Sequence, residues 1–383
     1  MRPFPLPPGR LSNRRNRVMA MFCLFVLAAQ SAQAPLYEAE LIFPRNPKHN
    51  HGSSIVETAD GSLIACWFHG SGERKEDDVI IQGARKRKGD AAWCDPFLMA
   101  DSQDLPDCNP VLFIDPRGTL WLFWIAVLNN EWGGSLLKYR TASQYVEDGP
   151  PKWDWQDVIH CRPVNLEKNP IGGAAQKDKL GQRLGWMTRL HPIMLSDTRM
   201  MLGLYSDVFN CSLAAFTSDW GKTWEFSEPI VGLGNIQPSF VKRKDGAVVA
   251  FMRENGLTRK VRTAVSPDNG ITWGKVESLD IPNPGSSVEC VPLKSGLWAL
   301  VCNDTTQGRH LLTAYLSDDE GTTWKWKRAL ESVEKDAGSF SYPSVIQAAD
   351  GTIHCTYSYS TADVKGSSIK HARFNEEWIR GEK

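Results

Sequence analysis

The chain has 383 residues, of which 42% are hydrophobic, enough to bury the core of one large domain or two ordinary ones. Lysine and arginine total 44, aspartate and glutamate also total 44, and the formal net charge at pH 7 is therefore zero. This balance argues against nucleic acid or an anionic membrane surface as a partner, so any basic site must be a local pocket.

The first 34 residues are predicted to be a signal peptide. "NRRNR" supplies positive charge, "VMAMFCLFVLAA" is an apolar run, and "SAQA" places small residues at Ala32 and Ala34 before Pro35. The apolar run is shorter than the roughly 20 residues that span a bilayer, and no later segment is long enough either. We expect cleavage after Ala34, a mature domain of residues 35–383, and a secreted or periplasmic location.

One strand and six hairpins are predicted after the leader. The stretch "LYEAELIF" is expected to pair with the last strands of the domain, which would remove an exposed sheet edge. Six further segments contain a Gly or Asp turn between runs rich in Val, Ile, Leu and aromatic residues, the pattern of a β-hairpin. They are residues 56–68, 112–124, 193–205, 241–253, 291–303 and 346–358.

A motif with the pattern Ser/Thr-x-Asp-x-Gly-x-Thr-Trp occurs three times, as "TSDWGKTW", "SPDNGITW" and "SDDEGTTW". The copies end at Trp224, Trp273 and Trp324, at intervals of 49 and 51 residues. Four strands in about 50 residues is the size of one propeller blade. No segment has a convincing helical period, so we predict an all-β fold, a six-bladed β-propeller filling residues 35–383. The polar stretch of about residues 145–185 is predicted to be a surface loop of the third blade.

The three motifs are predicted to be structural turns. Asp219, Asp268 and Asp319 can accept hydrogen bonds from their own turns, the Gly relieves the backbone, and the Trp packs into the sheet. Three copies on three blades cannot converge on one substrate, so none of these aspartates is expected to take part in catalysis.

Eight cysteines follow the leader, widely spaced and without a C-x-x-C pair. Several lie in apolar runs such as "LIACWF" and "LWALVCND", where a small buried thiol is the expected role. We predict no particular disulfide, no metal site and no cofactor, since no phosphate-binding glycine loop is present either.

The chain resembles the sialidase superfamily, in particular the sialidase-like proteins of the bacterial and plant type with Asp-box (BNR) repeats. The resemblance is carried by the Asp boxes and by "HGSSIVETADGSLIACWFHG", "CNPVLF", "IQPSF", "IPNPGSS" and "FSYPSVIQAADGTIHCTYSY". It implies a glycosidase of the exo-sialidase (neuraminidase) type that cleaves a terminal acidic sugar from a glycan, with Tyr as nucleophile and Asp as acid/base. A fold of this kind does not by itself fix the activity.

The resemblance assigns roles to particular residues. Arg253 and Arg309 are expected to bind the substrate carboxylate from equivalent strand positions in adjacent blades, since guanidinium matches carboxylate in a bidentate fork. Tyr342 is the expected nucleophile. Asp77 or Asp78 is the expected acid/base, with Glu73 and Arg74 as neighbours to consider.

Two departures from the family pattern are visible. Typical sialidases place a first clamp arginine in a Phe-Arg-Ile-Pro motif, where this chain has "HNHGSSI" and offers His51. The Glu that supports the Tyr corresponds to Gln237, which cannot take a proton, so Glu254 or Glu289 would have to substitute from another strand. Both changes bear on the activity.

Two alternative functions follow from these departures. In a polysaccharide lyase acting on uronic acids, Arg253 or Arg309 would neutralise the carboxylate while His51 or Tyr342 removed the neighbouring proton. A propeller that binds glycan without cleaving it would also tolerate the missing Arg and Glu. In every case the expected partner is a glycan that carries a carboxylate, and the sequence does not predict an oligomeric state.

Overall fold

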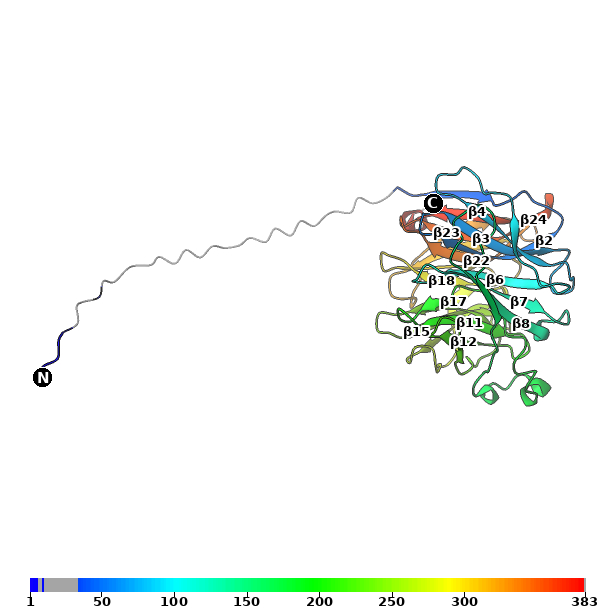
Figure 1. Cartoon of the computed structure of the whole chain (residues 1–383). Coiled ribbons are helices and arrows are strands. Elements are labelled where there is room, and N and C mark those ends of the chain that lie inside the picture. Colours follow the sequence, from blue (N-terminus) through cyan, green and yellow to red (C-terminus); the bar gives the residue numbers. More distant parts are fainter. Residues whose placement is uncertain (6–8, 10–33, 382–383) are drawn as a thin grey trace. The chain divides into compact units, whose positions relative to one another are not determined.

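The structure is a computed structural model that describes residues 1–5, 9 and 34–381. The predicted signal peptide lies almost entirely outside the described residues. The chain from Ala34 onward forms one compact unit of six four-stranded antiparallel sheets, and inner strands of neighbouring sheets contact one another. The prediction of an all-β, six-bladed β-propeller is confirmed (Figure 1).

The first three blades follow one another in the chain. Blade I contains β2 (His49–Glu57), β3 (Leu63–Gly70), β4 (Ile80–Lys86) and β5 (Phe97–Ala100). Blade II contains β6 (Asp107–Ile114), β7 (Leu120–Val127), β8 (Ser135–Ala142) and β9 (Trp155–Val158). Blade III contains β10 (Ile193–Met194), β11 (Met200–Ser206), β12 (Cys211–Thr217) and β13 (Glu225–Phe226).

The last three blades complete the ring. Blade IV contains β14 (Asn235–Lys242), β15 (Val248–Glu254), β16 (Lys260–Ser266) and β17 (Glu277–Pro282). Blade V contains β18 (Glu289–Pro292), β19 (Trp298–Asn303), β20 (Leu311–Ser317) and β21 (Trp326–Ser332). Blade VI contains β22 (Gly338–Gln347), β23 (Ile353–Thr361), β24 (Val364–Phe374) and β1 (Tyr37–Leu41). All six predicted hairpins are the first and second strands of a blade.

The ring closes by pairing the two ends of the domain. β1 lies antiparallel to β24, in a register that runs from Tyr37 opposite Phe374 to Leu41 opposite Lys370. This confirms the prediction for "LYEAELIF". Because β1 pairs with it, the edge that β24 would otherwise present is covered. Figure 1 shows blade VI beside β2, β3 and β4 of blade I. A short helix, α1 (Glu376–Arg380), follows and is capped by the side chain of Asn375.

The long connection after β8 departs from the prediction of a single loop in the third blade. Residues 155–158 form β9 and complete blade II by pairing with β8. The remainder contains two short 3₁₀ helices, η2 (Leu166–Lys168) and η3 (Gly173–Lys177), and another, η1 (Trp132–Gly134), precedes β8. Strand β9 was missed because its side chains are mostly exposed and carry no apolar alternation.

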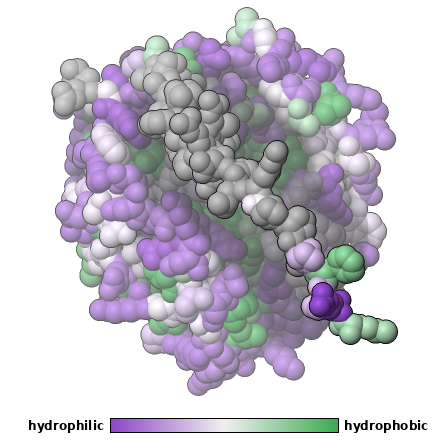
Figure 2. All heavy atoms as spheres, turned by 90° about the vertical axis from the view of Figure 1, so that its left-hand side faces the viewer, coloured by the Kyte–Doolittle hydropathy of each residue, from purple (hydrophilic) through white to green (hydrophobic). Residues whose placement is uncertain are grey.

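The core lies between neighbouring sheets, where large aromatic side chains such as Trp67, Trp121 and Phe251 are buried. Figure 2 views the molecule from the left-hand side of Figure 1, and that face is mostly hydrophilic with small separate hydrophobic groups. Seven of the eight cysteines in the described part of the chain are buried and none is in a disulfide; Cys94 is exposed. Within the same residues, no helix has the length and hydropathy needed to cross a membrane.

The three Asp boxes connect the third and fourth strands of blades III, IV and V. In the second box Asp268 accepts hydrogen bonds from Ser266 Oγ (2.8 Å), Thr272 N (2.9 Å) and Thr272 Oγ1 (2.6 Å). The other two boxes repeat this pattern around Asp219 and Asp319. The boxes are therefore structural turns, as predicted.

The boxes also join neighbouring blades. Trp224 packs edge-on against Phe123 and Tyr139 of blade II, with ring centroids 6.4 and 6.3 Å apart. Gly221 has a φ of +88°, and a Cβ there would lie 3.1 Å from the Trp121 ring of blade II. Glycine is needed for both reasons.

Replacing Asp268 by Ala should lower the free energy of unfolding by about 1–3 kcal/mol, because three donors of the turn lose their acceptor. Burial opposes ionisation of Asp268, but these hydrogen bonds outweigh it and lower the pKa of the carboxyl below 3.8. The difference in free energy of unfolding between the wild type and Asp268→Ala should therefore have its full size at neutral pH. It should shrink as the pH falls through that lowered pKa. Urea denaturation at several pH values measures it.

The control is Asp245→Ala in the β14–β15 turn, where the carboxylate accepts one hydrogen bond, from Ala247 N at 2.9 Å. An equal loss in both variants would contradict the special role of the box.

Candidate active site

Four innermost strands carry the same β-bulge at the same place. The register shifts between His51 and Ser54 in β2, between Cys108 and Val111 in β6, between Ile236 and Pro238 in β14, and between Ser341 and Ser344 in β22. In each bulge one residue has a left-handed backbone, and these residues are Gly52 (φ +63°), Asn109 (+51°), Gln237 (+56°) and Tyr342 (+59°). Pro follows three of them, which a bulge tolerates because no ladder hydrogen bond is required there.

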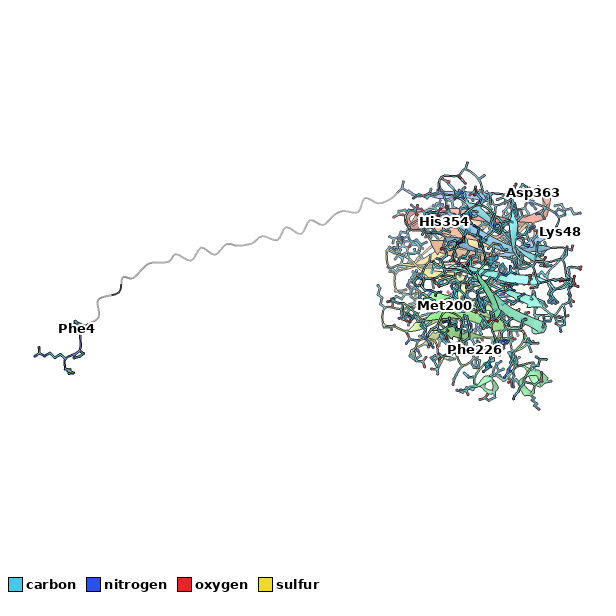
Figure 3. All side chains as sticks on the ribbon, in the orientation of Figure 1. Phe4, Lys48, Met200, Phe226, His354 and Asp363 are labelled. Atoms are coloured by element: carbon cyan, nitrogen blue, oxygen red, sulfur yellow. The ribbon has the colours of Figure 1, made fainter. Side chains whose placement is uncertain are left out.

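The bulges lie near the starts of the first strands and so at one end of the propeller. Lys48, which precedes β2, and Asp363, which follows β23, mark this end at the right of Figure 3, whereas Met200 at the start of β11 lies further left. A left-handed backbone is unusual for a bulky residue such as Tyr342 and costs on the order of 1–3 kcal/mol. A bulge also redirects a side chain, and strain of this kind is concentrated at functional sites.

Tyr342 lies at the centre of the convergent side chains. Its hydroxyl accepts a hydrogen bond from Arg253 Nη1 at 2.8 Å, and the Arg309 guanidinium lies 5.2 Å from its ring centroid. Burial opposes ionisation of the phenol, but the charges of Arg253 and Arg309 and the nearby amide of Gln237 outweigh it and lower the pKa of Tyr342 below 10. The predicted residues Tyr342, Arg253, Arg309 and Gln237 are thus brought together.

The two arginines reach Tyr342 from different places, contrary to the expectation of matched strand positions. Arg253 is the last residue but one of β15, and the residue at the corresponding distance from the turn of the β18–β19 hairpin is Asn303. Arg309 lies in the β19–β20 loop, and its nearest polar contacts, Ser341 Oγ and Gly285 O, are both at 3.4 Å. The reason is that the loop is long enough to fold back over β22, which the hairpin spacing does not reveal.

A second tyrosine, Tyr205 at the end of β11, was not found from the sequence. Its hydroxyl accepts hydrogen bonds from Asn109 Nδ2 at 3.0 Å and Gln237 Nε2 at 3.2 Å. Burial raises the pKa of Tyr205, so this phenol stays protonated. The repeated "NP", "QP" and "YP" dipeptides of the inner strands are the signal that would have found Asn109.

His51 is buried beside Tyr342. The two ring centroids are 4.1 Å apart, and His51 Nδ1 lies 2.7 Å from Ser358 Oγ. Burial, and then the charges of Arg309, His49 and other neighbours, hold the pKa of His51 well below 6.5, so the imidazole is neutral. His51 therefore supplies no positive charge in place of the missing clamp arginine.

Arg189, also missed from the sequence, holds the backbone of the site. Its side chain is fully buried, and it donates to the carbonyls of Ser53 (3.0 Å), Tyr342 (2.6 Å) and Pro343 (3.4 Å). It thereby connects the bulges of β2 and β22. Nothing in the local sequence "TRLHP" distinguished it from a surface arginine.

Neither glutamate proposed as a substitute base serves Tyr342. Glu254 accepts backbone hydrogen bonds from Gly256 N (2.8 Å) and Arg259 N (3.0 Å), and as the neighbour of Arg253 on a strand it points to the opposite face. Glu289 binds His191 Nδ1 (2.7 Å) and Val345 N (2.6 Å). Both carboxylates are buried and already have their partners.

The β3–β4 loop holds the predicted acid/base residues at the rim. Asp78 binds Lys48 Nζ at 2.7 Å and Ser71 Oγ at 2.6 Å, and these contacts lower the pKa of its carboxyl. Asp77 accepts from Asn130 Nδ2 at 3.0 Å. Arg74 stacks 5.0 Å from the Trp132 ring and pairs with Glu131 at 3.4 Å.

Glu73 is the member of this loop that faces Tyr342 and Arg309, since its charge acts on both, and it lies 3.5 Å from His49 Nε2. Burial opposes ionisation of Glu73, but His49, Arg309 and Arg74 outweigh it and lower the pKa of the carboxyl. Glu73 is therefore ionised at neutral pH.

Cavity volume does not mark this site. A cavity of about 840 Å³ lies at the hairpin-turn end, bordered by Glu40, His354 and His371 and by none of the predicted site residues, while Arg309 borders one of about 510 Å³. Over residues 34–381, no group of three or more His, Cys, Asp or Glu side chains is arranged to hold a metal ion. The site is marked by the convergent polar side chains around Tyr342.

Comparisons with known proteins agree with the fold. The family described as "BNR repeat-like domain" matches residues 61–355. A sialidase of Micromonospora viridifaciens is 26% identical over 182 residues, which cover 44% of this chain and only 26% of that protein.

Two solved structures are similar over most of the chain. A Dyadobacter fermentans protein of unknown function has a TM-score of 0.69 at 16% identity and covers 88% of this chain and 98% of its own. The intramolecular trans-sialidase of Ruminococcus gnavus has a TM-score of 0.68 at 13% identity and covers 89% and 98%. At these identities the likeness concerns the fold.

The lowered pKa of Tyr342 predicts a distinctive spectroscopic titration. Tyrosinate absorbance should begin to appear below pH 10, and Tyr342→Phe should remove this first step, because burial raises the pKa of Tyr139, Tyr145 and Tyr205. Arg253→Met should move the step to higher pH. Near-ultraviolet absorbance measures it, with Tyr139→Phe as the control, and an unchanged first step in Tyr342→Phe would contradict the assignment.

Proposed function

This chain belongs to the family of BNR repeat-like domains, and from that premise we propose that it is a glycoside hydrolase of the exo-sialidase type. The proposed substrate is a glycan with a terminal acidic sugar. The observation that carries the proposal is the Tyr342 hydroxyl bound by Arg253 at 2.8 Å, with Arg309 over the same ring, in a strained backbone conformation.

The proposed substrate carboxylate binds between Arg253 and Arg309. The contacts of the Arg309 guanidinium at 3.4 Å are long for hydrogen bonds, so its donors are available to an anion. Arg253 uses Nη1 for Tyr342, and its Nε is buried without a partner among the described residues. Two guanidinium groups and the neutral His51 then replace the three-arginine clamp of typical sialidases.

Tyr342 is the proposed nucleophile, activated by cations instead of by a carboxylate base. Gln237, whose amide donates to the Tyr205 hydroxyl, cannot accept the proton of Tyr342, so the reactive species is the phenolate that Arg253 and Arg309 stabilise. The two guanidinium groups offset the charge of this phenolate, which reduces the repulsion that an attacking carboxylate would meet from an anionic sugar.

One observation favours a second candidate, a lyase acting on uronic acids. His51 is neutral and lies against Tyr342, as a base and acid pair for β-elimination would require. Digestion of uronate polymers would then produce an unsaturated sugar and a rise in ultraviolet absorbance. Binding to a glycan array without any product by mass spectrometry would instead favour the binding propeller.

We also propose a secreted or periplasmic location, on the basis of the leader-like residues 1–34. Sequencing the N-terminus of the exported protein should find Pro35.

Replacing Tyr342 by Phe should reduce turnover of a fluorogenic sialoside on the order of 10⁴-fold, because the nucleophile is lost while the ring is kept. Tyr359→Phe is the control, since Tyr359 lies in β23, packs at a tilt against Phe340 and is faced by Arg45 instead of by Arg253 or Arg309. Turnover that Tyr342→Phe leaves intact would refute the assigned role, and absence of turnover by the wild type would count against the hydrolase.

A further inference from the structure

Asp207 is a carboxylate at the mouth of the site that the sequence did not indicate. It is the first residue of the turn that follows β11, two residues after Tyr205. Tyr205 contacts Asn109 and Gln237, and the charges of Arg253 and Arg74 act on Asp207, so Asp207 lies at the rim of the same site.

The surroundings of Asp207 come from three other elements. Its charge acts on Tyr205, on Arg253 of β15 and on Arg74 of the β3–β4 loop. Its turn is fixed on both sides, because Val208 packs against Gly133 and Asn210 Oδ1 accepts from Asn255 Nδ2 at 3.2 Å. Asp207 therefore lies on the Arg253 side of Tyr342, whereas Glu73 lies on the Arg309 side.

Asp207 differs from the other rim carboxylates in having no partner. Asp78 is bound by Lys48 and Ser71, Asp77 by Asn130, and Glu73 by His49. Over residues 34–381, Asp207 makes neither a hydrogen bond nor an ion pair, although its side chain is accessible to solvent. Solvent reaches the side chain, but the protein around it desolvates the carboxyl enough to raise its pKa, and Arg253 and Arg74 oppose this shift. The pKa of Glu73, in contrast, is lowered. When the pKa values of two carboxyls are shifted apart in this way, the one with the raised pKa, Asp207, suits a proton donor, and the other, Glu73, stays an anion.

We propose that Asp207 is the acid/base of the hydrolysis, donating a proton to the glycosidic oxygen as Tyr342 attacks. This inference rests on the proposed function. In the first step the Tyr342 phenolate oxygen bonds to the anomeric carbon, the bond from that carbon to the leaving oxygen breaks, and the Asp207 proton moves to the leaving oxygen. In the second step Asp207 takes a proton from water, the water oxygen bonds to the anomeric carbon, and the Tyr342 phenolate is released.

The test measures hydrolysis of two substrates with different leaving groups by the wild type and by Asp207→Asn. Sialyllactose has a poor, alkoxide-like leaving group that needs a proton, whereas an aryl sialoside with an acidic phenol does not. Asp207→Asn should slow sialyllactose hydrolysis about 10²–10⁴-fold and aryl sialoside hydrolysis far less. In the wild type, kcat/KM should fall at alkaline pH because Asp207, which Arg253, Arg74 and Tyr205 face, loses its proton. Asp207→Asn should remove this fall.

Asp245→Asn, in the β14–β15 turn at the opposite end of the blade, is the matched control and should leave both rates unchanged. Asp207 is accessible to solvent, so Asp207→Asn should keep the wild-type Tm.

Two results would overturn the assignment of Asp207 but not the proposed function. In the first, the wild type is active and Asp207→Asn keeps full activity on sialyllactose. In the second, Asp77→Asn, Asp78→Asn or Glu73→Gln, instead of Asp207→Asn, loses activity on sialyllactose and not on the aryl sialoside. A wild type that hydrolyses neither probe would overturn the proposed function and this assignment together.

Discussion

The buried guanidinium of Arg189 is the contact on which the rest of the site depends. It donates to backbone carbonyls on both sides of the ring closure, at Ser53 in β2 and at Tyr342 and Pro343 in β22. A fully buried cation is costly unless it is compensated, and the carbonyls together with the nearby charge of Glu289 supply this compensation. Because these carbonyls belong to the bulges, the same contact holds Tyr342 in its left-handed conformation.

Glu289 extends this network across the propeller axis. It binds His191 Nδ1 and Val345 N, while His191 Nε2 lies 2.8 Å from Ile55 O. Burial opposes protonation of His191, but Glu289 outweighs it and raises the pKa of the imidazole, so both ring nitrogens can donate. Blades I, III, V and VI are thereby tied together beneath the site, and the charged floor is rigid where Tyr342 must be held in place.

Above this floor the site is rich in cations, and over residues 34–381 no carboxylate is hydrogen-bonded to the Tyr342 hydroxyl. Where a glutamate would accept the phenol proton, Gln237 offers only an amide, and Arg253 and Arg309 favour the phenolate. The proton is handled in our proposal at a different place, Asp207 on the Arg253 side. Our proposal thus assigns activation of the nucleophile and protonation of the leaving group to separate parts of the ring. The site also differs from that of typical sialidases in having the neutral His51 where they have the first clamp arginine.

The sequence by itself determined the fold and the centre of the site. The period of the Asp boxes and the six hairpins specify the blades because each is a local pattern of turn residues and strand alternation, and family likeness then pointed to Tyr342, Arg253, Arg309, Gln237 and His51. The tertiary structure alone brought in Arg189, Tyr205, Asn109 and Asp207, and alone removed Glu254 and Glu289 as bases. The roles of these residues depend on which strands meet across the ring and on which way a bulged residue points. No local stretch of the sequence specifies either, because both result from contacts between segments that lie far apart in the chain.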